Sequence, residues 1–357
     1  MQGWLLAVVL AAVLDTSSPF TNYSTEVLAP GVFAFVAPDD ESGIVNSNTL
    51  LVVGDDAALV VDTGQFPSLT RRQIAEIRRI TPVPVRYVVT THWHGDHHMG
   101  NVAYREAFPD AVFLAHEETR RLELKNGLKE LAEATDSARK QIAAVEALLA
   151  HGKGRSGAPL RADQRRHLDA FLADMRLYPA EVDAATFVPS SVTFRDGVTI
   201  QLGRREVRVM HLGRGNTAGD AVVYVPDAKV LAAGDLLVAP TPFAFGSYVR
   251  EWPRTLDALT AIDATTIVPG HGPVMHDFTY ARRVRDALVR IDSQVRDEVA
   301  KGKTLEQVQA SVKLDAVATG FAARGDAYRV DALANAFVAP AVDRAFQEAQ
   351  GQLADEE

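Results

Sequence analysis

The sequence predicts a globular fold built from both strands and helices. Of its 357 residues, 47% are hydrophobic and 23% are charged, which is enough apolar material for a full core and too much for a disordered chain. Short runs rich in β-branched residues are separated by Gly and Asp turn residues. Other segments space their apolar residues as an α-helix does, so strands and helices share the chain.

The predicted strands fall into two groups. In the first group, β-rich runs occupy residues 32–36, 48–53 and 58–61, and a helical pattern follows at 69–80. Residues 85–90 then predict a buried strand that runs straight into a histidine-rich segment. The second group of predicted strands lies at residues 191–202, 207–210, 221–225 and 230–233.

Residues from about 117 to 180 differ in composition from the rest of the chain. They are rich in Ala, Leu, Glu, Lys and Arg and nearly free of β-branched residues, which predicts two or three amphipathic helices inserted into the fold. Such an insertion suits a lid over a site, a dimer face or a surface layer equally well, and no oligomeric state is predicted. We expect a main domain at residues 27–280 and a C-terminal helical extension at 281–357.

The first twenty residues have the pattern of an export signal. An apolar run from Trp4 to Leu14 is too short to span a bilayer and has the length of a secretory signal core. No Lys or Arg precedes it, so a buried N-terminal segment is the alternative reading. We expect residues 1–20 to be a signal peptide, the protein to be periplasmic or secreted, and no stable membrane span elsewhere.

Charge and cysteine content exclude several classes of function. The net charge is -9, and no run of basic residues offers a surface for a phosphate backbone, so we expect no nucleic-acid partner. The chain has no Cys, which removes disulfides, thiolate zinc sites and cysteine nucleophiles. Any metal site must therefore use His, Asp, Glu or Asn.

Four of the ten histidines lie in one short stretch with a metal-ligand spacing. His92 and His94 alternate in a loop directly after the predicted strand, so both can face one metal ion. Asp96 and His97 follow where the chain turns and can face a second ion. Imidazole and carboxylate ligands without thiolate suit zinc, with iron or manganese as alternatives. A chance cluster of surface histidines would not be expected to have this spacing at a strand end.

Four segments in order resemble the metallo-β-lactamase superfamily. In chain order they are V-V-D-T-G at 60–64, T-H-W-H-G-D-H at 91–97, A-G-D-L at 233–236 and I-V-P-G-H-G at 267–272. The resemblance covers about residues 32–274. It implies an α+β fold, a four-layer αββα sandwich of two mixed sheets with helices outside and the metals at one edge.

The resemblance also implies roles for individual residues. By it, His92 and His94 bind a first metal, while Asp96, His97 and His271 bind a second. Asp235 bridges the two metals, and Asp62 supports the ligands from behind. Asp96 and Asp235 are also the candidates for proton transfer during catalysis.

Two positions depart from the family pattern. Asp235 is similar to the glyoxalase II, lactonase and phosphodiesterase branches, whereas the best-known secreted β-lactamases carry Cys or Ser there. The family's remaining His ligand to the first metal aligns with Asn216, whose carbonyl is a weaker zinc ligand than imidazole. His211, five residues earlier at a strand end, is the alternative ligand. The expected cofactor is therefore one or two zinc ions.

The expected activity is hydrolysis of a small-molecule substrate. A hydroxide bound to zinc would open a cyclic amide or ester, either a β-lactam or a lactone. An apolar loop after Asp235 offers Phe243, Phe245 and Tyr248 as walls for the substrate pocket. The alternatives are a mononuclear iron enzyme like the persulfide dioxygenases, a phosphodiesterase, and a metal-stabilised binding module without turnover.

Overall fold

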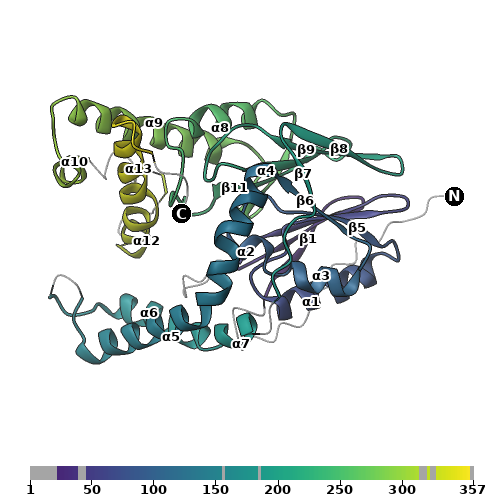
Figure 1. Cartoon of the computed structure of the whole chain (residues 1–357), viewed down its shortest axis with the longest axis horizontal. Coiled ribbons are helices and arrows are strands. Elements are labelled where there is room, and N and C mark those ends of the chain that lie inside the picture. Colours follow the sequence, from purple (N-terminus) through teal and green to yellow (C-terminus); the bar gives the residue numbers. More distant parts are fainter. Residues whose placement is uncertain are drawn as a thin grey trace.

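The computed structural model describes residues 22–38, 46–154, 157–183, 186–312, 320–321 and 327–353, so the predicted signal peptide at residues 1–20 lies outside the described residues. The described chain forms two β-sheets with helices on the outer side of each (Figure 1).

The first sheet has seven strands whose order follows the chain. Strands β1 to β4 pair antiparallel, whereas β4 to β7 run parallel. All four residues of β4 are buried, as expected for a strand covered on both faces. The strands are β1 (Ser24–Ala29), β2 (Val32–Val36), β3 (Thr49–Val53), β4 (Ala58–Val61), β5 (Val85–Val89), β6 (Val112–His116) and β7 (Val192–Phe194).

The second sheet has five strands in the order β12-β11-β10-β9-β8. Its pairs are antiparallel except for β11 and β12, which run parallel. Parallel neighbours need a crossover connection, and the helix α8 (Trp252–Thr260) lies in the segment that joins them. The strands are β8 (Gly197–Leu202), β9 (Arg205–His211), β10 (Ala221–Val225), β11 (Val230–Val238) and β12 (Thr266–His271).

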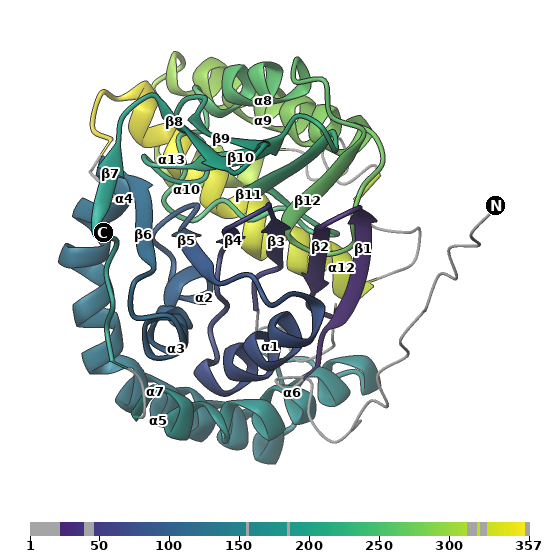
Figure 2. The same cartoon turned by 90° about the vertical axis from the view of Figure 1, so that its right-hand side faces the viewer.

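The two sheets pack face to face, and helices cover their outer faces. Leu50 of β3 shares a buried cluster with Val223 of β10. Its neighbour Leu51 points the opposite way, as strand geometry requires, into a cluster with the helices α1 (Pro67–Ile80) and α3 (Asn101–Ala107). On the other side, α8 and α9 (Thr279–Val299) cover the second sheet (Figure 2). This order of layers confirms the predicted αββα sandwich.

The predicted insertion is helical and begins at Glu117. Its long helix α5 (Leu128–His151) is capped by Gly152, which adopts the left-handed conformation that favours glycine at a helix end. Figure 2 shows the part from α5 to α7 on the side of α1 and α3 that faces away from the sheets, whereas α4 lies beside β6 and β7. The segment comprises α4 (Glu117–Leu122), the π-helix η2 (Glu123–Gly127), α5 (Leu128–His151), α6 (Ala162–Met175) and α7 (Tyr178–Asp183).

The C-terminal helices join the layer outside the second sheet. Phe337 and Ala341 belong to the same buried cluster as α8 and α9. The insertion reaches this layer where the ring of His167 stacks on Tyr328 at 3.5 Å between ring centroids. None of the described helices is long and apolar enough to cross a membrane. The remaining helices are α10 (Leu305–Ser311), α12 (Ala327–Leu333), η3 (Ala334–Val338) and α13 (Ala339–Ala349).

Candidate metal centre

The candidate His and Asp metal ligands and Asp62 follow strand ends in the first sheet and lie in the second half of strands in the second sheet. Since β4 and β5 are parallel neighbours, Asp62 and His92 emerge at the same edge of the first sheet. The short helix α2 (Gly95–His98) starts directly after His94 and carries Asp96 and His97. The second sheet contributes Asp235 from β11 and His271 from β12.

A glycine lets the two strands of the second sheet present their ligands together. A Cβ on Gly270 would lie 1.9 Å from Oδ1 of Asp235, so any larger residue there would displace the carboxylate. The motif residue Gly270 is therefore required by close packing beside the candidate ligand.

Asp235 lies between the imidazoles of the cluster. Its Oδ2 is 3.6 Å from Nε2 of His92, while its Oδ1 is 3.2 Å from Nε2 of His97 and 3.5 Å from Nε2 of His271. The two oxygens of one carboxylate thus face different histidines. This is the arrangement that a bridging ligand needs.

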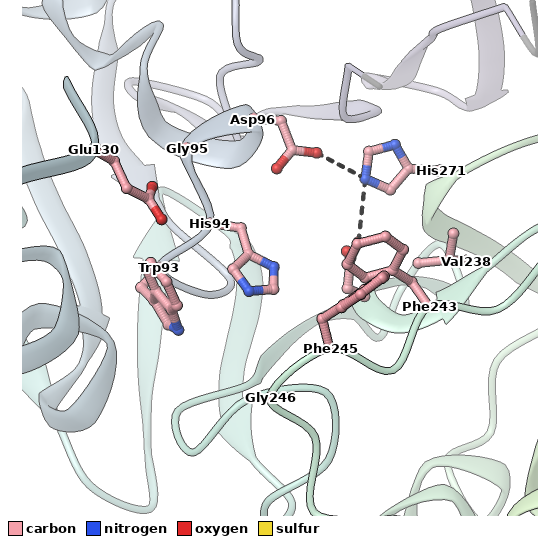
Figure 3. Close-up of a pocket in the computed structure, with 11 residues that line it drawn as sticks. Trp93, His94, Gly95, Asp96, Glu130, Val238, Phe243, Phe245, Gly246 and His271 are labelled. Carbon is pink, nitrogen blue, oxygen red and sulfur yellow. Dashed lines mark ion pairs between the residues drawn. The ribbon is translucent and has the colours of Figure 1, made fainter. Parts of the chain in front are cut away.

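Asp96 completes a second group of ligand atoms. Its Oδ2 lies 3.0 Å from Nε2 of His271 (Figure 3). The same oxygen lies 3.5 Å from Nε2 of His97. Asp96, His97 and His271 can together hold one ion, and His92, His97 and Asp235 form a second such group. His94 adjoins that second group, with its Nδ1 2.9 Å from Nε2 of His92. The structure therefore brings together the six residues of the predicted His/Asp cluster.

The outward nitrogens of three histidines are hydrogen-bonded, which orients their Nε2 atoms inward. Nδ1 of His97 donates to Oδ2 of Asp62 at 2.8 Å, and Nδ1 of His271 donates to the backbone oxygen of Asn46 at 3.1 Å. Nδ1 of His92 lies 3.1 Å from Oγ1 of Thr91, which itself donates to Asp62. Supports of this kind fix the tautomer of a metal-binding histidine. Asp62 lies in the supporting position expected from the sequence.

Electrostatics in the cluster favour a bound cation. The pKa of His92 is lowered well below its usual value by burial, and the neighbouring imidazoles add to the effect. Burial alone would lower the pKa of His97 too, but the carboxylates of Asp235, Asp96 and Asp62 raise it well above its usual value. Three carboxylates around one buried imidazole create negative charge that a divalent cation would neutralise. The donor set therefore fits zinc.

Asn216 is a buried amide without hydrogen-bond partners among the described residues. The side chain is fully buried, and neither its Oδ1 nor its Nδ2 is bonded. Buried amides are normally satisfied, so these atoms point to a ligand that the described part of the chain does not supply. The turn that carries Asn216 borders the His/Asp cluster. Ala218 packs with Trp93, and the backbone N–H of Ala221 donates to the backbone oxygen of Thr91 at 2.9 Å.

His211, the alternative ligand, is engaged in a different cluster. Its Nδ1 donates to the backbone oxygen of Asp220 at 2.8 Å. Its ring stacks on His116 with 4.1 Å between the ring centroids. The structure thus places His211 against the end of β6 and does not group it with the His/Asp cluster.

A cavity of about 370 Å³ opens beside the cluster (Figure 3). One end is aromatic, with Phe243 and Phe245 in contact at 4.5 Å between ring centroids, and Phe243 lies 6.5 Å from the ring of His94. The main side chains that line the cavity are those of Trp93, His94, Asp96, Glu130, Asp235, Val238, Phe243, Phe245 and His271.

Two residues of the cavity region differ from the sequence prediction. Tyr248 is predicted as a pocket wall but is buried behind it, where its ring packs with Trp93 and lies under the guanidinium of Arg214 at 4.2 Å. Conversely, Glu130 of the insertion helix α5 lines the cavity, although no motif marks it. Partial desolvation of its carboxyl and the nearby charge of Asp96 raise its pKa to about 7, although the residue as a whole remains exposed.

Comparison with known proteins agrees with these observations. The profile of the metallo-beta-lactamase superfamily matches residues 42–271. The linear primary-alkylsulfatase of Pseudomonas sp. (strain ATCC 19151) is 27% identical over 283 residues, or 76% of this chain and 51% of the relative. The chain thus spans about half the length of that relative. Metallo-beta-lactamase IND-1 of Chryseobacterium indologenes is 34% identical over 88 residues, which are 23% of this chain and 37% of the relative.

Solved structures agree on the fold. The metallo-beta-lactamase from Pontibacter korlensis has a TM-score of 0.52 at 21% identity, covering 75% of this chain and 99% of its own. DIM-1 metallo-beta-lactamase has a TM-score of 0.51 at 17% identity, covering 75% and 97%. At these identities the likeness shows the fold alone. Because the family profile covers more than half of the chain, the protein belongs to the metallo-beta-lactamase superfamily.

Proposed function

We propose that the protein is a zinc hydrolase that opens an ester or cyclic amide bearing an apolar group, with substrates that carry no negative charge, such as lactones, preferred. The observation that carries this proposal is the lining of the cavity. Trp93, Phe243 and Phe245 form an apolar wall directly beside the cluster, and no Lys or Arg is among the described residues that line it. Such a wall suits an acyl or alkyl group better than a polyanion.

The proposed ligands divide into two sets that share one carboxylate. His92, His94 and Asn216 would hold one ion, while Asp96, His97 and His271 would hold the other, with Asp235 common to both. Zinc bound there would lower the pKa of a water molecule to about 7 and polarise the scissile carbonyl.

The protein's own groups would guide the proton and the substrate. Asp96 and Asp235 both line the cavity, so their carboxylates are placed to accept a proton from the attacking water and pass it to the leaving group. The aromatic pair at Phe243 and Phe245 would hold the apolar part of the substrate and exclude water from that end. Phe245 is 47% exposed in the free protein, so a bound apolar group would cover it.

Alkyl sulfate ester hydrolysis is the second candidate. The named relative that matches 76% of this chain is an alkylsulfatase, and the apolar wall also suits an alkyl chain. A sulfate ester is anionic, however, and the cavity lining offers it no Lys or Arg. The lack of Lys and Arg in the lining also disfavours two other anionic substrates, namely a phosphodiester and a β-lactam that carries a carboxylate.

A substrate panel in which the lactone, the neutral ester and the sulfate ester share one chain length tests the proposal. The zinc-loaded protein would be assayed with an octyl-substituted lactone, p-nitrophenyl octanoate, a chromogenic cephalosporin, octyl sulfate and bis(p-nitrophenyl) phosphate. We expect the highest kcat/KM for the lactone or the neutral ester, and loss of that activity in His97→Ala. Preferred turnover of octyl sulfate would transfer the assignment to the second candidate. Turnover of none of the five by loaded protein would contradict both.

A further inference from the structure

A second cavity of about 310 Å³ adjoins the metal-site cavity under the insertion. It lies between α5, α7 and the loop that follows β4. The Glu130 side chain lines both cavities, so the two share a wall. Figure 3 shows Glu130 and the Phe243–Phe245 pair at opposite ends of the first cavity, with His94 and Asp96 between them. A substrate that crosses the cluster from the aromatic end would reach Glu130 and the second cavity beyond it.

The second cavity is joined to the metal centre through hydrogen bonds. The Tyr178 hydroxyl, which lines it, accepts a hydrogen bond from Nε2 of Gln65 at 3.1 Å. The backbone N–H of Gln65 donates to Oδ1 of Asn46 at 2.7 Å, and the backbone oxygen of Asn46 supports His271. On the other side, Oε2 of Glu130 lies 3.9 Å from where a Cβ on Gly95 would be, beside Asp96. Residues that line the second cavity are therefore hydrogen-bonded to, or lie against, the segments that carry the candidate metal ligands.

The chemistry of the second cavity differs from that of the first. Its polar lining is supplied by Gln65, Glu130, Glu133, Ser137, Gln141 and Tyr178. An ionised carboxylate can accept hydrogen bonds but cannot donate them. The carboxamides and hydroxyls can both accept and donate. No Lys or Arg is among the described residues that line it. The lining therefore favours a ligand group that donates hydrogen bonds and carries no negative charge.

Resting on the hydrolase function proposed above, we propose that this second cavity is a substrate subsite for a hydroxyl-rich or ammonium group, with Glu130 as the residue that selects it. The substrate class is then an amphiphile. Its apolar part lies against Phe243 and Phe245, its scissile bond lies at the cluster, and its hydrogen-bond-donating part lies beyond Glu130.

Matched amphiphiles test the subsite without requiring turnover. Octyl glyceryl ether, octylammonium and octyl sulfonate share one chain and differ only in the head group, and their binding to zinc-loaded protein can be measured by titration calorimetry. At about pH 9, where Glu130 is ionised, the glyceryl or ammonium compound is expected to bind about tenfold more tightly than the sulfonate, since one net hydrogen bond to a charged group is worth about 1.4 kcal/mol or more. The two favoured compounds tell a hydroxyl-rich group from a cationic one.

Variants on one helix locate the effect. Glu130→Gln and Glu133→Gln are expected to reduce the preference over the sulfonate, with the larger loss in Glu130→Gln. Asp136→Asn makes the same charge change on α5 at an exposed position paired with Arg139, and it should leave the preference unchanged. Equal binding of all three compounds, or an unchanged preference in Glu130→Gln, would overturn the subsite.

Failure of the subsite can be separated from failure of the hydrolase proposal. Selective, Glu130-dependent binding without hydrolysis of any ester would leave the subsite intact and remove the proposed activity. Ester hydrolysis whose rate does not depend on the head group, together with equal binding of the three octyl compounds, would leave the hydrolase proposal intact and remove the subsite.

Discussion

Single residues decide how the cluster is oriented. Asp62 accepts hydrogen bonds from Nδ1 of His97 and from both the backbone N–H and the hydroxyl of Thr91. It adopts a backbone φ of 56°, which is uncommon for a residue other than glycine. One side chain thus joins the ends of β4 and β5 to a candidate ligand, and its cost in backbone strain indicates a functional constraint.

Replacing Asp62 by Asn should weaken metal binding while retaining the fold. The amide is nearly the same size, but it removes the negative charge that stabilises the N–H of His97. Loss of such a support typically lowers metal affinity about 10- to 100-fold. Competition with a coloured chelator measures the affinity, and Asp55→Asn, at an exposed position paired with Arg204, serves as the control. An affinity equal to that of the unaltered protein would contradict the role given to Asp62.

Asn216 is expected to be the weak point of one metal position. Asn216→His supplies the stronger imidazole ligand and should tighten binding of one metal equivalent by on the order of tenfold, whereas Asn216→Ala should loosen it. Equilibrium dialysis with elemental analysis gives the stoichiometry and affinity of both variants. If neither substitution changes metal binding and both proteins remain folded, Asn216 is not a ligand.

The residues that the sequence predicted best are those in local motifs. The H-x-H-x-D-H motif places four candidate ligands within six consecutive residues, so the local backbone is enough to bring them close. Glu130 and Tyr248 depend instead on how distant segments pack. Glu130 reaches the cavity because α5 crosses beside α2, and Tyr248 is buried because Arg214 and Trp93 cover it. No local pattern encodes either placement.

At the scale of elements, the loop after β11 forms the apolar end of the site. Phe245→Ala should leave stability nearly unchanged, because the side chain is 47% exposed. It should lower kcat/KM for an octanoyl ester about tenfold, since about 1.4 kcal/mol of lost apolar contact corresponds to that factor. The rate for the matching acetyl ester should not change. Equal losses for the two esters would show that the loop does not recognise the chain.

The packing of α13 introduces a pH-dependent term in stability. Loss of water contact raises the pKa of Glu348 to about 7 from its usual 4.5, while its Oε2 accepts the backbone N–H of Arg250 at 3.1 Å. Because the pKa of Glu348 is higher in the folded state than in the unfolded state, protonation of Glu348 increases the free energy of unfolding. Its contribution is therefore complete below pH 4.5 and is lost as the pH rises through about 7.

Glu348→Gln should remove this dependence. Between about pH 4.5 and 7, the free energy of unfolding of the variant should fall less steeply with pH than that of the unaltered protein. Urea unfolding at several pH values measures the slope, and Glu306→Gln on α10 is the matched control. Parallel slopes for all three proteins would show that Glu348 has no such effect.

At the scale of the whole molecule, the site exists because two sheets that pack face to face bring their ligand-bearing strands to the same edge of the sandwich. The first sheet carries Asp62 and the His92–His97 segment, and the second carries Asp235 and His271. Short strands with turn residues made both sheets predictable, and the family resemblance supplied their face-to-face packing. The position of the insertion was not predictable. Its helices are largely polar, so their sequence shows where they begin and end but not which surface they cover.

Removal and return of metal test the central claim most directly. The protein would be stripped with a chelator, its metal content measured by elemental mass spectrometry, and zinc returned stepwise while hydrolysis of the preferred neutral ester is followed. We expect hydrolysis to vanish on stripping and to return with zinc, reaching its limit by two equivalents per chain. Full hydrolysis by stripped protein would contradict a metal-dependent mechanism. Restoration by iron alone, with oxygen consumption, would contradict the zinc hydrolase.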